Sequence, residues 1–146
     1  MKSLTLLAIL AIVPCSVAAQ PRPLDIIRLV GDLNRINERV LALTETVGPD
    51  DILLRTIKDV VSTLRGDTNA ALHVTNMYYL AECDNINSDL TEYIQQVYRD
   101  TIEAAEWAEG LQYVEENAST ASARLAARDA MRTARSIKQI LEPHAG

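Results

Sequence analysis

Apolar side chains recur at steps of three and four residues along residues 24–47, beginning shortly after an apolar N-terminal stretch. They are Ile26, Leu29, Leu33, Ile36, Val40, Leu43 and Val47, and charged or amide side chains fill most of the positions between them. This spacing places seven apolar residues on one face of a helix. We expect that face to be buried against other helices, a lipid or an apolar surface.

Three further amphipathic segments follow, separated by turn-forming residues. Gly48-Pro49 ends the first helix, and Asp50 or Asp51 caps a second helix that is expected to bend or weaken near Gly66. The polar run 83–89 is typical of a loop. Asp89 and Glu92 have the spacing of a capping box that opens a third helix.

The third apolar face runs through Leu90, Ile94 and Val97 to Leu111. The polar residues 117–120 make the next break, an alanine-rich helix follows, and Pro143 closes it. No segment of useful length alternates apolar and polar residues with a period of two, so strands are not expected. The pattern predicts an all-α protein, an antiparallel bundle of about four amphipathic helices.

The N-terminus has the pattern of a secretory signal. Lys2 precedes a ten-residue apolar stretch, and Val17-Ala18-Ala19 places small residues before a cleavage site. Cleavage after Ala19 gives residues 1–19 as the signal peptide and residues 20–146 as one secreted helical domain. The alternative is a lipoprotein signal acylated at Cys15, which the preceding Pro14 disfavours.

Charge and composition limit the classes of partner that the protein is expected to bind. The formal net charge is −6, which argues against nucleic acid because phosphate binding needs a basic surface. No second apolar stretch is long enough for an integral membrane span. Asn117 begins the Asn-Ala-Ser sequon, a glycosylation site in a eukaryotic host. Cys83 would be the one cysteine left after cleavage, and we expect it to be a buried apolar residue rather than an intermolecular bridge or a free thiol.

Candidate chemistry is sparse, and we expect no catalytic residues, no cofactor and no metal. His73 and His144 lie far apart, and His73 has no partner at metal-ligand spacing. The acidic run 100–109 could bind a cation on one side of its helix, but a solvated surface opposite the final helix is favoured. Likewise, the row Arg124, Arg128, Arg132 and Arg135 could meet carboxylates or anionic headgroups, although pairing with the third helix is favoured.

The first stripe is the candidate ligand site. We expect its side chains to form one wall of an apolar site for a fatty acid or another lipid: Ile26, Leu29, Leu33, Ile36, Val40 and Leu43. The alanines of the last helix would either leave room for such a ligand or allow tight packing.

The signal, the stripe opened by Asp25-Ile26 and the further amphipathic helices together resemble the fungal hydrophobic-surface-binding protein A family, which includes cell-wall mannoproteins. The resemblance implies a protein that is secreted, either into the medium or to the cell wall, and that adsorbs to hydrophobic surfaces or carries lipids. The arginine row and the acidic third helix depart from the family pattern. Two rival functions remain: an effector or structural protein that binds another protein through a helical face, and a small hydrolase.

Overall fold

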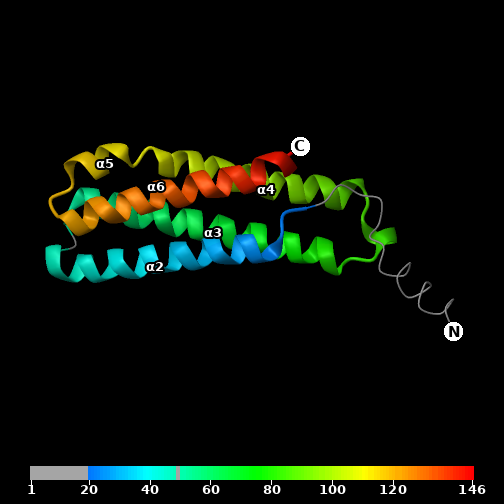
Figure 1. Cartoon of the computed structure of the whole chain (residues 1–146), viewed down its shortest axis with the longest axis horizontal. Helices are drawn as coiled ribbons and strands as arrows, with labels where there is room; N and C mark the ends of the chain where they lie inside the picture. Colours follow the sequence, from blue (N-terminus) through cyan, green and yellow to red (C-terminus); the bar gives the residue numbers. More distant parts are fainter. Residues whose placement is uncertain (1–19, 49) are drawn as a thin grey trace, which may run out of the picture.

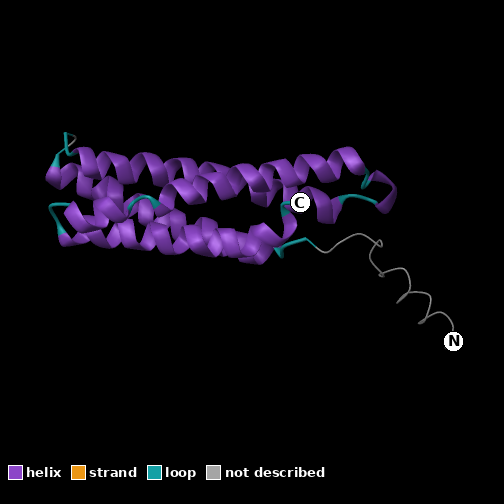
Figure 2. Cartoon of the chain, turned by 90° about the horizontal axis from the view of Figure 1, so that it is seen from above, coloured by secondary structure: helices purple, strands orange, loops and turns teal. Residues whose placement is uncertain are grey.

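The computed structural model describes residues 20–48 and 50–146, and in this part of the chain it is all-α (Figure 2). The predicted signal peptide lies outside the described residues. Four long helices form the body: α2 (Pro23–Val47), α3 (Ile52–Leu80), α4 (Ser88–Glu109) and α6 (Ala121–Leu141). The short elements are η1 (Cys83–Asn85), α5 (Gln112–Asn117) and η2 (Glu142–His144). The predicted fold class is therefore confirmed.

Successive helices run in opposite directions and form an antiparallel bundle (Figure 1). Helix α2 packs on α3, α3 on α4, α4 on α6, and α6 returns to α2, so the four helices enclose one core. The hairpin of α3 and α4 extends beyond the start of α2 and the end of α6. This extension exposes the end of α3 and the start of α4, two helices that are packed on both sides elsewhere.

Local signals explain most helix boundaries. Gly48 ends α2 with φ of 99°, a conformation that glycine adopts without steric cost. The side chain of Asp51 caps α3 by accepting a hydrogen bond from the Leu54 amide, and Thr120 caps α6 in the same way. Asn87 caps α4 by accepting from the Leu90 amide. The expected Asp89–Glu92 capping box is therefore wrong, because the cap lies two residues earlier.

Two expected interruptions differ from the observed ones. Helix α3 passes through Gly66 without a break, because tertiary packing on both sides of that turn outweighs the weak helix propensity of one glycine. The expected third helix is instead divided. Gly110 ends α4, and the Gly110 and Leu111 amides bond to carbonyls three residues back. This tight turn keeps Leu111 and Val114 in the core as α5 begins.

The core is filled by aliphatic side chains from α2 and α3 and by small side chains from α6. Five alanines of α6 are at most 4% exposed: Ala123, Ala126, Ala127, Ala130 and Ala134. Small residues let this helix approach its neighbours closely. The buried polar side chains in the described part of the chain are threonines and Asn37, and Thr68, Thr75 and Thr101 each donate to a carbonyl four residues back.

Candidate functional site

The predicted ligand wall lies in the interior of the bundle. Five of its six side chains are buried, with exposures of 0–7%: Ile26, Leu29, Leu33, Ile36 and Val40. Leu43 is partly buried against the same core. Each of these positions faces side chains of α3, α4 or α6 within two contiguous hydrophobic clusters. In the folded bundle, α2 therefore uses its stripe to hold the helices together.

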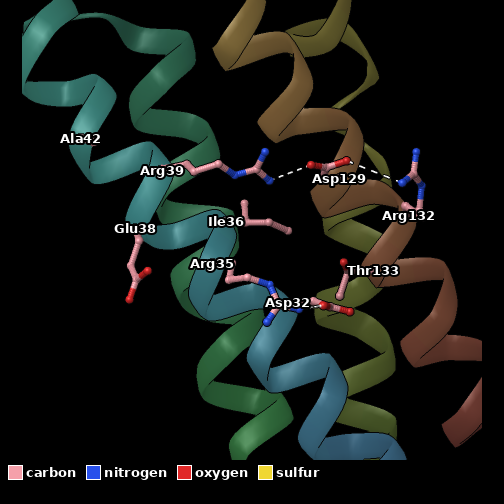
Figure 3. A pocket seen from close by; sticks show the side chains of 9 residues that line it. All are labelled: Asp32, Arg35, Ile36, Glu38, Arg39, Ala42, Asp129, Arg132 and Thr133. Carbon is pink, nitrogen blue, oxygen red and sulfur yellow. Dashed lines mark hydrogen bonds and ion pairs between the residues drawn. The ribbon is translucent and has the colours of Figure 1, made fainter.

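A polar groove of about 630 Å³ runs between α2 and α6 (Figure 3). Only Ile36 of the predicted wall borders it, and most of its other lining side chains are charged. Asp129 lies between two arginines, 2.6 Å from Arg39 and 3.8 Å from Arg132, while Arg35 pairs with Asp32. The arginines of this groove already face carboxylates, so they offer little unbalanced charge to a ligand, and the Arg39–Asp129 pair connects α2 to α6.

The arginine row of α6 is mostly occupied by contacts within the protein. Arg124 donates to the Ala118 carbonyl at 2.8 Å, and Arg128 lies 2.7 Å from Glu115. Lys138, further along α6, lies 3.5 Å from Glu109. These contacts attach the last helix to α4 and α5, as the opposite charges of the two segments predicted. The favoured pairing with the third helix is thus observed for Arg128, whereas Arg124 donates to a carbonyl that follows α5 and Arg132 lies near Asp129 of its own helix.

The acidic run of α4 does not lie on one side of the helix, contrary to expectation. On a helix of 3.6 residues per turn, side chains three residues apart differ in direction by about 60° around the helix axis. Glu109 consequently faces α6, while Asp100 lies close enough to Asp67 of α3 to raise the pKa of that carboxyl. Among residues 20–48 and 50–146, no group of three or more potential ligands is placed to hold a metal ion.

The remaining candidate residues lie on the surface. His73 is exposed on α3, and Cys83 is exposed in η1, so the expected burial of Cys83 is wrong. A cluster of cap and turn residues surrounds Cys83, which keeps it outside the core. Asn117 is exposed at the end of α5, where its side-chain amide donates to the Tyr113 carbonyl at 2.7 Å. Glycosylation of Asn117 stays a prediction.

Exposed apolar side chains lie together at one end of the bundle, and we call this end the apolar end. Its members come from the start of α2, the end of α3 and the start of α4: Leu24, Ile27, Met77, Tyr79, Leu80 and Tyr93. Leu80 is 85% exposed at the last residue of α3. The Tyr79 hydroxyl donates to the Gln20 carbonyl at 2.8 Å, which holds the chain preceding α2 against this end.

Another exposed aromatic side chain lies near the end of α4. Trp107 of α4 is 73% exposed and borders a groove of about 260 Å³ between α3 and α4. Asp59, Val60, Thr63 and Ala104 line the rest of this groove. Trp107 follows an apolar position of α4 by three residues, so the sequence alone did not indicate that it faces solvent.

The geometry defines an antiparallel helical bundle with an aliphatic core, an apolar end and surface grooves between neighbouring helices. The chain matches no protein-family model, no curated protein and no solved structure. Within the described residues, no helix combines the length and the apolar character needed to cross a bilayer.

Proposed function

We propose that this is a secreted, non-catalytic protein that binds hydrophobic surfaces or lipids. The observation that carries the proposal is the apolar end of the bundle. It presents six large apolar side chains, of which Tyr79 and Tyr93 are aromatic with a polar tip, the kind of side chain favoured where an apolar phase meets water. The resemblance to hydrophobic-surface-binding protein A supports the same function.

The secretory signal and the position of Gln20 are consistent with this surface. Cleavage after Ala19 would make Gln20 the first residue of the mature chain, and the Tyr79 contact places Gln20 beside the apolar end.

The proposal that the protein is non-catalytic rests on the side chains of the interior. Apart from Tyr98, the buried polar side chains of the described residues are threonine hydroxyls and the Asn37 amide. Catalysis by acid, base or covalent attack usually relies on a nucleophile held beside an oriented base. His73 and Cys83 are exposed, on α3 and in η1, and so lie outside the buried interior.

The buried stripe limits how a lipid would bind. A fatty acid lying among the α2 side chains would have to replace their contacts with the other helices, so binding there requires the bundle to loosen. Adsorption through the apolar end requires no such change. We therefore place the first contact with a hydrophobic surface at that end.

The charges near the apolar end predict which surfaces are preferred. Exposed carboxylates surround it in the α3–α4 connection and the first turns of α4: Glu82, Asp84, Asp89 and Glu92. Like charges repel at short range in dilute salt. The protein should bind neutral phosphatidylcholine vesicles and hydrophobic beads better than vesicles rich in an anionic lipid, and added salt should reduce that difference.

Adsorption of two matched variants tests the proposal. Leu80→Asp changes the most exposed apolar side chain of the apolar end, and Leu125→Asp changes an exposed leucine of α6 outside that end. Both positions are exposed, so both variants should fold, as circular dichroism would verify. We expect the first variant to lose about tenfold or more in affinity for octyl-coated beads and neutral vesicles, and the second to stay within about twofold, because burying an unpaired charge is costly.

Equal adsorption of both variants would refute the role of the apolar end. No adsorption by the wild-type protein, together with no displacement of a fluorescent fatty acid, would refute lipid binding altogether and favour the rival function of binding another protein. Secretion is checked separately by N-terminal sequencing of protein from culture medium, which should begin at Gln20.

A further inference from the structure

Lipid adsorption at the apolar end does not explain which residues line the groove between α3 and α4. Its lining includes the chain's single tryptophan, Trp107, with Val60 and Ala104 beside it. Val60 is partly buried and Ala104 is buried, so the indole stands at the edge of a hollow with an apolar base. Aromatic side chains exposed in this way are enriched where proteins bind other proteins.

Of the acidic residues along the contact between α3 and α4, Asp59 lines this groove, and Asp67, Asp100 and Glu103 lie outside its lining. Asp59 lines the groove opposite Trp107, and Asp67 lies further along α3 close to Asp100 of α4. Thr101 Oγ1 lies 3.1 Å from the Asp67 carbonyl oxygen, which places that turn of α3 against α4. Glu103 precedes Trp107 by one helical turn and is exposed. In the described part of the chain, none of these four carboxylates forms an ion pair within 4.0 Å.

Acidic residues on the other side of the bundle are arranged differently. Glu109, Glu115 and Asp129 are each paired with a lysine or arginine across a helix–helix contact. Arg55 and Lys58 of α3 line a groove against α2, and Arg99 of α4 donates to the Ala145 carbonyl. In the described part of the chain, Asp59, Asp67, Asp100 and Glu103 therefore leave negative charge without ion pairs along the contact between α3 and α4.

Unbalanced carboxylates beside an exposed indole favour one kind of occupant. An arginine or lysine side chain can lie on the indole face by a cation–π interaction and pair with a neighbouring carboxylate. A cation placed between Asp67 and Asp100 would also relieve the repulsion between those two groups. A purely apolar occupant would instead bury carboxylates without partners, which is unfavourable.

We propose that the α3–α4 groove binds a basic segment of a partner protein, with one cationic side chain on Trp107 and Asp59 and a second between Asp67 and Asp100. Asp59 and Asp67 are eight residues apart, which corresponds to about 12 Å along a helix at 1.5 Å per residue. The partner segment therefore presents two arginine or lysine side chains separated by roughly two helical turns. This proposal uses a different surface from the apolar end and does not depend on lipid binding.

Intrinsic fluorescence provides a direct measurement because Trp107 is the only tryptophan. The probe is a synthetic amphipathic helical peptide with two arginines seven residues apart, compared with the same peptide carrying glutamine at those positions. We expect saturable quenching or a spectral shift of Trp107 with the arginine peptide. The affinity should fall as salt is raised, and the glutamine peptide should bind about tenfold more weakly or worse.

Charge-matched variants separate a defined site from general attraction to an acidic protein. The double variant Asp59→Asn/Asp67→Asn removes two carboxylates from the contact between α3 and α4, and Asp89→Asn/Glu92→Gln removes two from the exposed start of α4. We expect the groove variant to bind the arginine peptide at least tenfold more weakly and the control to stay within about twofold. Calorimetry with Trp107→Leu should also show at least a tenfold loss.

Three results would overturn the proposal. One is equal affinity for the arginine and glutamine peptides, and another is an equal loss in the groove and control variants. The third is a response of Trp107 to neutral phosphatidylcholine vesicles but not to the arginine peptide, which would make the groove a lipid contact. None of these results alters the expected difference between Leu80→Asp and Leu125→Asp, so the two proposals are tested separately.

Discussion

The Tyr98 hydroxyl lies 2.6 Å from Thr75 Oγ1 in the core of the bundle, where both side chains are fully buried. Thr75 also donates its single hydroxyl proton to the Ala71 carbonyl at 2.7 Å. Tyr98 is therefore the donor in the contact with Thr75. This chain of two hydrogen bonds connects α4 to α3 and satisfies the phenol of the largest fully buried side chain.

Replacing this phenol should have a small and specific cost. In Tyr98→Phe the ring still fills its space and Thr75 keeps its bond to Ala71, so we expect the free energy of unfolding to fall by about 0.5–1.5 kcal/mol, the net value of one hydrogen bond. Urea unfolding followed by circular dichroism measures the change. Tyr93→Phe, at an exposed position, is the control and should be neutral.

Stability should depend on the protonation of Asp67. Burial, and secondly the negative charge of Asp100, raise the pKa of Asp67 above its ordinary value of 3.8. The folded state therefore holds this proton more strongly than the unfolded state does. The resulting stabilisation is fully present below about pH 3.8 and is lost as pH rises through the raised pKa.

Asp67→Asn should consequently be more stable than the wild type at pH 7, and the difference should shrink as the pH falls below 4. Unfolding curves at pH 3.5 and pH 7 test this expectation. Asp50→Asn, at an exposed position before α3, serves as the comparison and should show no such pH-dependent gain. A stability difference for Asp67→Asn that is the same at both pH values would contradict the assigned cause.

Truncation in the α2 stripe distinguishes a packed core from a ligand space. Leu33 is fully buried in the middle of α2. If its neighbours pack tightly, Leu33→Ala should cost about 2–5 kcal/mol through lost contacts and a cavity. If the stripe instead lines a binding space, the free energy of unfolding of the delipidated protein should fall by less. The preference among fatty acids should then also shift toward bulkier chains.

Gly66 offers a stabilising substitution. It is exposed within the unbroken helix α3, and a side-chain carbon added there would meet no atom within 4 Å. Gly66→Ala should raise the free energy of unfolding by about 0.5–1 kcal/mol, since alanine loses less backbone entropy in a helix. Loss of stability in this variant would show that α3 needs glycine at this turn.

Helical periodicity by itself determined the class of fold and the composition of most of the core. The stripe from Ile26 to Val40 is buried as its spacing predicts, and so are Ala123, Ala127, Ala130 and Ala134 of α6. These predictions hold because an amphipathic helix has one face that must leave water, whatever its partners are. Turn residues such as Gly48 and Thr120 mark helix ends for equally local reasons.

Tertiary structure alone decided which surfaces stay open. Ile52, Met77 and Trp107 belong to helical patterns that also contain buried residues, yet all three are exposed. Their exposure depends on where each helix ends relative to its neighbours and on how far around each helix those neighbours reach. The unpaired carboxylates near Trp107 and the apolar end beyond α2 arise from the same cause, because both depend on contacts between segments far apart in the chain, which local spacing does not specify.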